Sequence, residues 1–266
     1  MTDGQSRSNF RLFAGVRLVS SLTLASRVLG LLRDMGMAAV FGNGAVLDAF
    51  TVAFRIPNLA RRLFGEGALS TALIPVFLRE SERGGPDRAW RVASSVVTVV
   101  GVLLAGGVIL AETILWAATK LIPCGIEARL LMGLAAVMLP YLLLICAAAQ
   151  LGAVLQALGH FTWPALLPII LNVGWIAAIW CVTPHFTTPE AKVYALATTI
   201  VGLGLVQLVA PWPTLRRFGF RYRFDWSSTR ESVTEVMRTM FPIVLGLSIT
   251  QLNTLCDSLI AWGFSA

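Results

Sequence analysis

Long apolar runs, separated by short polar, proline or glycine breaks, dominate the pattern of hydrophobic and polar positions along this chain. At about 1.5 Å of rise per helical residue, runs of this length suffice to cross a hydrocarbon core of about 30 Å. The pattern therefore predicts transmembrane helices rather than the amphipathic elements of a soluble domain. Seven helices are predicted, over residues 17–41, 47–79, 90–118, 127–158, 162–184, 190–215 and 231–263.

The second predicted helix, 47–79, is too long for one straight crossing. Pro57 lies inside it and removes one backbone hydrogen-bond donor, which kinks or breaks a helix. We therefore expect two shorter helical pieces or a strongly tilted span.

Composition agrees with a membrane protein. Hydrophobic residues make up 56% of the 266 residues and charged residues only 13%, and the mean hydropathy is +0.76. A water-facing surface usually needs about 25% charged residues, so a soluble enzyme is excluded. We predict an all-α polytopic membrane protein, with a cytoplasmic N-terminal segment at 1–16 and a seven-helix transmembrane lobe at 17–266.

Basic residues outside the predicted helices fall mainly on one side. Counted together with the residues that bracket each loop, twelve arginines lie before the first helix or around the loops between the second and third and the sixth and seventh, against three basic residues on the other side. Because cytoplasmic loops carry the excess of Lys and Arg, the N-terminus is predicted to be cytoplasmic and Ala266 to lie outside. The twelve are Arg7, Arg11, Arg17, Arg79, Arg83, Arg88, Arg91, Arg216, Arg217, Arg221, Arg223 and Arg230; the three are Lys120, Arg129 and Lys192.

The loop at 216–230 alternates aromatic with basic or small residues: RRFGFRYRFDWSSTR. Such a segment could stack and neutralise single-stranded nucleic acid. In a membrane protein it fits the headgroup layer better, with rings at the interface and guanidinium groups on the phosphates of anionic lipids. We therefore predict anionic membrane lipids, and not nucleic acid, as its partners.

Charged residues interrupt the first two predicted helices. A charge near the bilayer centre costs at least ~2.5 kcal/mol, so such residues are candidates for function. Glu112, Arg238 and Asp257 occur singly in other helices. The first helix holds Arg27, Arg33 and Asp34, and the second holds Asp48, Arg55, Arg61, Arg62 and Glu66.

Helical rise places these arginines at matching depths. Counted from the outer ends of the two antiparallel helices, Arg33 and Arg55 lie about 12 Å deep, and Arg27 and Arg61 about 21 Å. Some must pair internally with the acidic residues, but three acids cannot neutralise five arginines. Guanidinium forks bind phosphate oxygens bidentately, so a water-filled cavity for a diphosphate-bearing ligand is predicted.

The same stretches resemble a known family. SRVLGLLRD (26–34), FG (41–42), DAF (48–50) and FRIPNLARRLFGEGALSTALIPVF (54–77) are similar to the amino-terminal signature of the MurJ/MviN family of lipid II flippases. Residues 140–172 and 241–261 resemble later helices of that family more loosely, so the resemblance covers nearly all of the chain after residue 17.

This resemblance implies a transporter of the multidrug/oligosaccharidyl-lipid/polysaccharide exporter superfamily, with fourteen helices in two lobes. Its members move the undecaprenyl-diphosphate-linked peptidoglycan precursor, lipid II, from the inner to the outer leaflet of the bacterial inner membrane by alternating access. The seven predicted helices correspond to the first lobe, so a separate second lobe is an expected partner.

The resemblance also assigns roles. Arg27, Arg33 and Arg61 match arginines regarded as contacting the lipid diphosphate, and Asp48 and Glu66 match acidic positions. Asp257 matches a position that helps to hold a sodium ion in some members, with its other ligands in the second lobe. No tightly bound cofactor is expected; a sodium ion or the membrane potential would supply the energy. Helical periodicity, in contrast, favours Arg62 over Arg61 as the partner of Arg55, because seven residues return a side chain to nearly the same face.

Three other functions compete with this one. An exporter of another lipid-linked oligosaccharide or of a drug would keep the fold without needing the motif. A membrane-embedded enzyme is disfavoured, since the sequence offers no nucleophile and base constellation and no metal-ligand cluster. A non-transporting remnant is distinguished from a flippase by whether a second lobe exists.

Overall fold

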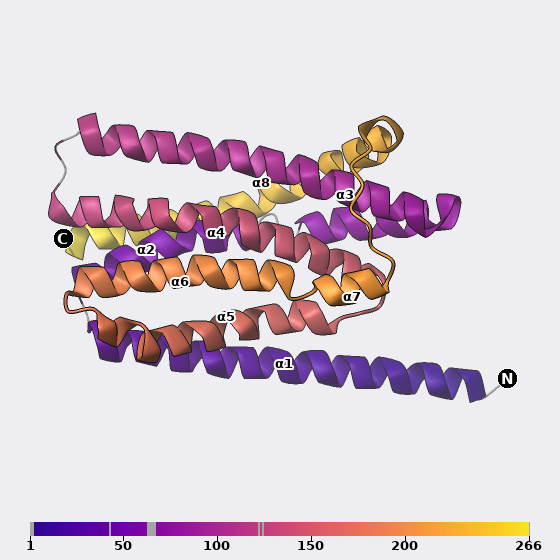
Figure 1. Cartoon of the computed structure of the whole chain (residues 1–266), viewed down its shortest axis with the longest axis horizontal. Coiled ribbons are helices and arrows are strands. Elements are labelled where there is room, and N and C mark those ends of the chain that lie inside the picture. The colour runs from indigo at the N-terminus through magenta and orange to yellow at the C-terminus, as the bar shows by residue number, and fades with distance from the viewer. Residues whose placement is uncertain (1–2, 43, 63–67, 122, 124, 266) are drawn as a thin grey trace.

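The computed structural model describes residues 3–42, 44–62, 68–121, 123 and 125–265, and these residues form helices and connecting turns without a β-strand. The helices lie side by side along one long axis (Figure 1). Their bounds are α1 Asp3–Phe41, α2 Ala45–Ala60, α3 Ala68–Leu121, α4 Ile126–Ala157, α5 Thr162–Cys181, the 3-10 turn η2 Thr183–His185, α6 Pro189–Val209, the short α7 Trp212–Arg217 and α8 Trp226–Ser265.

Three predicted boundaries are wrong. α1 begins at Asp3 rather than at residue 17, and α8 begins at Trp226 rather than at 231. Polar residues without proline extend both helices beyond their apolar runs, and a hydropathy pattern marks the apolar run and not the helix end. The predicted loop between residues 79 and 90 is shortened to a turn at Gly84 and Gly85, with helix on both sides of it.

The expected division of segment 47–79 into two pieces is confirmed, but the break does not fall at Pro57. α2 continues through the buried Pro57 to Ala60, and α3 starts at Ala68. Pro57 lies in the last turn of α2, so the N–H hydrogen bond that it lacks, to the carbonyl of Ala53, falls only one turn before the helix ends. Arg61 and Arg62 follow in a short π-helical turn, a feature that often accompanies functional sites.

α3 is a helical hairpin rather than a rod. Gly85 has φ 73°, a left-handed conformation that glycine adopts without steric cost, and it reverses the chain so that the two legs run side by side (Figure 1). The buried carboxylate of Glu80 accepts hydrogen bonds from Arg88 Nε and, at 3.1 Å, from Ser232 Oγ. The contact with Arg88 joins the two legs of the hairpin, and the contact with Ser232 fastens the hairpin to α8.

Two apolar cores hold the bundle together, and α4 contributes to both. One joins α1, α2, α4, α5 and α6 around Phe50 and Trp175, whose ring centroids lie 5.5 Å apart. The other joins α3, α4 and α8 around Phe77 and Trp90, with centroids 5.4 Å apart. Because α4 packs in both cores, it fixes the α1–α2–α5–α6 group relative to the α3–α8 group.

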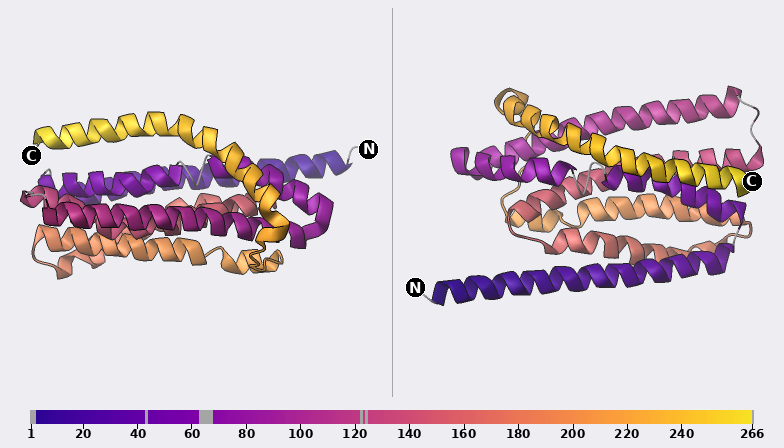
Figure 2. Two further views of the ribbon diagram at one scale, coloured as in Figure 1. Left: turned by 90° about the horizontal axis from the view of Figure 1, so that it is seen from above. Right: turned by 180° about the vertical axis from the view of Figure 1, so that it is seen from behind.

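Five helices are long and apolar enough to cross a membrane among the residues described, namely those within 68–121, 126–157, 162–185, 189–217 and 226–249. The N-terminus, the α3 hairpin and the segment between α7 and α8 gather at one end of the bundle, and the C-terminus lies at the other (Figures 1 and 2). The three groups of basic residues noted in the sequence therefore belong to one end, as predicted. Which side of the membrane that end faces remains a prediction.

Candidate cationic substrate site

A cavity of ≈530 Å³ lies between α1, α2, α4 and α5, with Gln207 of α6 also in its wall. Arg33, Arg61 and Arg62 line it, and its lining among the described residues includes no aspartate or glutamate. Its wall therefore carries an excess of positive charge, which suits an anion. The remaining lining residues are Val19, Thr23, Phe54, Asn58, Ser70, Ile145, Ala149, Gly152, Gln156, Phe161, Pro164, Ala165, Leu167, Pro168, Leu171 and Asn172.

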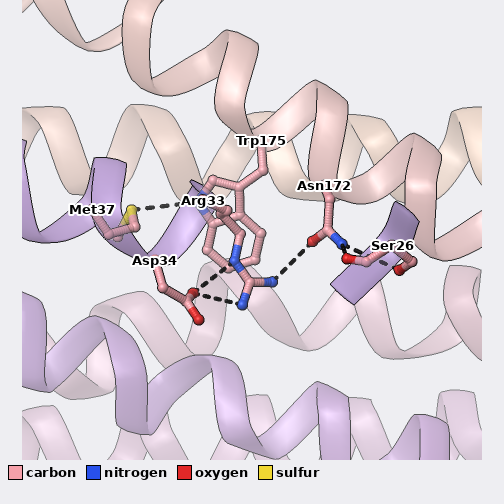
Figure 3. A network of polar contacts seen from close by, with 6 residues as sticks. All are labelled: Ser26, Arg33, Asp34, Met37, Asn172 and Trp175. Atoms are coloured by element: carbon pink, nitrogen blue, oxygen red, sulfur yellow. Dashed lines mark hydrogen bonds and ion pairs between the residues drawn. The ribbon is translucent and has the colours of Figure 1, made fainter. Parts of the chain in front are cut away.

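Arg33 is held from two sides (Figure 3). Its Nε and one terminal nitrogen donate to Oδ1 of Asp34 at 2.9 and 2.7 Å, and its other terminal nitrogen donates to Oδ1 of Asn172 at 3.2 Å. The Asn172 amide nitrogen in turn donates to the backbone oxygen of Ser26 at 3.0 Å. Asn172 is 6% exposed, so this buried amide ties α5 to α1 at the arginine.

The ring of Trp175 provides a flat support for Arg33. The guanidinium carbon lies 4.5 Å from the ring centroid, within the range of a cation–π interaction. Trp175 is itself fixed, because it is 3% exposed, its indole N–H donates to the sulfur of Met37 at 3.4 Å, and Phe54 meets it edge-on at 4.7 Å. Three of the five guanidinium N–H groups are engaged by Asp34 and Asn172, which leaves two donors for a ligand.

Arg61 is oriented within its own helix. Its Nε and one terminal nitrogen donate to Oδ1 of Asn58 at 3.3 and 3.1 Å. Asn58 and Arg61 both line the cavity, together with the exposed Arg62. Both Arg61, which the family resemblance favoured, and Arg62, which helical periodicity favoured, therefore line the cavity from the π-helical turn.

Arg27 does not join Arg33 in the cavity wall. It is exposed on α1 and absent from the cavity lining, although Thr23, about one helical turn before it, belongs to that lining. Arg55 and Asp48 are partly buried on α2 and are also absent from the lining. Glu66 lies outside the described residues. The predicted pairing with acids holds for Arg33 and Asp34.

Asp257 is exposed on α8, and the described part of the chain contains no group of three His, Cys, Asp or Glu side chains that could hold a metal ion. A sodium ion at Asp257, with its other ligands in a second lobe, therefore stays a prediction.

Sequence reasoning missed Asn58, Asn172 and Trp175. A signal was present for Asn172, which is a lone amide within the apolar run 162–184. A buried polar group needs a partner, but which partner it finds depends on how the helices pack.

Comparison with known proteins gives a consistent result. The family model described as "Lipid II flippase MurJ" matches residues 37–265. A Vibrio cholerae protein named "Probable lipid II flippase MurJ" is 36% identical over 94% of this chain and 50% of its own length. The "Lipid II flippase MurJ" of Burkholderia cenocepacia is 34% identical over the same shares of the two chains.

Two solved structures share the fold. A lipid II flippase MurJ in an inward closed conformation superposes with a TM-score of 0.73 at 25% identity, over 92% of this chain and 50% of that chain. A MOP superfamily transporter from Pyrococcus furiosus gives a TM-score of 0.62 at 16% identity, over 88% and 52%. The chain spans about half the length of the curated relatives it matches. From the family match along most of its residues, this all-helical chain belongs to the lipid II flippase MurJ family.

Proposed function

We propose that this chain is the amino-terminal lobe of a flippase that moves lipid II from the inner to the outer leaflet of the bacterial cytoplasmic membrane. The observation that carries the proposal is that Arg33 and Arg61, from different helices, line one cavity whose described wall has no acidic residue. The diphosphate of lipid II, esterified at both ends, carries one negative charge on each phosphate and several acceptor oxygens. Two oriented guanidinium forks complement it better than ammonium groups would.

The transport mechanism requires a second group of helices. In transporters of this kind, one bundle rocks against another around a binding site at their interface. The cavity would hold the headgroup diphosphate while the partner lobe opens alternately to each side. Arg27 is exposed on α1, so we assign it to the face that meets the second lobe rather than to the cavity wall.

Lipid binding by the purified chain tests this proposal. The affinity for lipid II is measured in detergent by native mass spectrometry, beside undecaprenyl monophosphate and an uncharged prenol. Arg33→Ala and Arg61→Ala should each weaken lipid II binding about tenfold, because each removes charge-assisted hydrogen bonds to phosphate. Arg27→Ala should have a smaller effect on the isolated chain.

Arg129→Ala is the matched control, since Arg129 is exposed at the other end of the bundle from the basic loops. Thermal unfolding of every variant separates loss of binding from loss of fold. Unchanged lipid II affinity in both cavity variants would refute the proposal. Equal affinity for the monophosphate and the diphosphate lipid would favour an exporter of another anionic lipid.

A further inference from the structure

A second cavity, of ≈500 Å³, lies at the basic end of the bundle and is formed by one continuous segment. The segment joins a candidate membrane span that ends at Arg217 to one that begins at Trp226. It therefore lies where two helices leave the hydrocarbon core, at the depth of lipid headgroups. We call residues 218–225 the strap. The cavity is lined by Trp212, Arg216, Gly219, Phe220, Arg221 and Tyr222.

The walls of this cavity are preorganised by packing. Phe220 is 8% exposed and meets Trp212 and Trp90 edge-on, with ring centroids 5.4 and 5.1 Å apart. Farther along the strap, the backbone N–H of Arg223 donates to the hydroxyl of Ser94 on α3 at 3.2 Å. The strap is thus fastened to α3, and a ligand would not have to order it.

The charge of the cavity is positive. Arg216 and Arg221 are both exposed in its wall, and the lining residues that the structure describes include no acidic side chain. Asp225, the acidic residue of the strap, accepts hydrogen bonds from the hydroxyls of Ser227 and Ser228 at 2.8 and 2.7 Å. These hydrogen bonds hold the pKa of Asp225 below its ordinary value and engage its carboxylate at the start of α8. It is therefore already satisfied within the chain.

Aromatic rings complete the site. The guanidinium carbon of Arg216 lies 5.8 Å from the centroid of Trp212, and the Tyr222 side chain is 55% exposed. Tryptophan and tyrosine favour the membrane interface because their rings are amphipathic. A pair of arginines between such rings provides donors for a phosphate and apolar surface for the adjoining glycerol.

We propose that this cavity binds the phosphate of an anionic phospholipid, with Arg216 and Arg221 as its ligands and Trp212 and Tyr222 flanking the headgroup. The proposal differs from general attraction to a charged bilayer, because it assigns the affinity to two of the four arginines at 216–223. It is independent of the lipid II cavity and would hold for any transport substrate.

The test measures stabilisation of the purified chain by short-chain phosphatidylglycerol in detergent, from the shift of the thermal unfolding midpoint during a lipid titration. Arg216→Gln and Arg221→Gln should each raise the half-saturating lipid concentration about tenfold, the effect of losing a charge-assisted hydrogen bond to phosphate. Arg217→Gln and Arg223→Gln are matched controls. They remove the same exposed charge from the same segment outside the cavity lining and should change it by less than about threefold.

An equal rise of the half-saturating lipid concentration in all four variants would overturn the proposal in favour of diffuse surface charge. No rise in any variant would also overturn it. Phosphatidylcholine and inorganic phosphate are titrated in parallel. Weaker stabilisation by both supports an anionic lipid as the occupant, whereas stabilisation by inorganic phosphate alone would contradict it.

Discussion

At the scale of single residues, a partly buried arginine is useful to a transporter only if its guanidinium group can reach the substrate. Arg33 satisfies this condition because Asn172 and Trp175 of α5 and Asp34 of its own helix fix both the plane and the position of the guanidinium group. A free arginine side chain loses about 2 kcal/mol of rotamer entropy when it is immobilised. The network removes most of that cost before a ligand arrives.

We therefore expect Asn172 and Trp175 to act as positioning residues. Asn172→Ala or Trp175→Leu should reduce the preference for lipid II over undecaprenyl monophosphate about fivefold to thirtyfold, since a cation–π contact or a charged hydrogen bond contributes about 1–2 kcal/mol. Trp175→Phe keeps an aromatic face and should retain most of the preference. The ratio of the two dissociation constants is the measurement, because general destabilisation lowers both affinities together.

Trp180→Leu is the control for this pair, since Trp180 lies on the same helix and is 60% exposed. An unaltered affinity ratio in both Asn172→Ala and Trp175→Leu would show that Arg33 does not depend on α5.

At the scale of elements, close helix packing in a membrane relies on small residues. α4 and α6 approach at Gly204, where an added Cβ would lie 2.6 Å from Cδ2 of Tyr141. Tyr141 cannot easily withdraw, because it is 1% exposed and its hydroxyl donates to Oε1 of Gln207 at 3.4 Å. Gln207 also lines the cationic cavity, so this contact supports one wall of the site.

Gly204→Ala should therefore destabilise the chain by about 1–3 kcal/mol through overpacking. Gly202→Ala is a close control, because Gly202 lies in the same helix and an added Cβ there would meet no atom within 4 Å. It should be neutral or slightly stabilising, because alanine favours the helix over glycine. Thermal unfolding in detergent, followed by tryptophan fluorescence, compares the two; equal midpoints would contradict the packing argument.

At the scale of the whole molecule, the basic segments at one end predict the orientation in the membrane. In a variant without the four native cysteines, a single cysteine is placed at Gly44 or at Arg223, which are exposed at opposite ends of the bundle. A membrane-impermeant maleimide added to intact cells should label the cysteine at position 44 and not the one at position 223. The reverse pattern would invert the topology.

The single lobe should not transport lipid II alone. α1 packs mainly against α5 and exposes a mixed face that includes Arg27 and Leu31, the latter 62% exposed. A charge on such a face is costly against lipid, and alternating access needs a second bundle. In cells depleted of their own flippase, this chain should fail to restore growth unless a second-lobe protein is co-expressed. Growth restored by the chain alone would contradict this expectation.

The sequence by itself determined the class of the protein, the helices and the end at which the basic segments gather. These are local or additive properties. The length of an apolar run is compared with the thickness of the bilayer, and the number of basic residues in each loop is summed without regard to their spatial neighbours. The candidate charges were also found in this way, because a charge within an apolar run stands out from its surroundings. Helix ends were less predictable, since the N-terminal part of α1 and the first turn of α8 are polar.

Only the tertiary structure decided which charges act together. Of the two α1 arginines that the sequence grouped, Arg33 lines the cavity and Arg27 is exposed outside its lining, and a contact of Arg27 with the diphosphate stays a prediction. Nothing in the sequence indicated that Asn172 and Trp175, far along the chain, would hold Arg33. The physical reason is that hydropathy records how much a residue costs in lipid, whereas the direction of a side chain and the identity of its partner depend on how helices distant in sequence pack together.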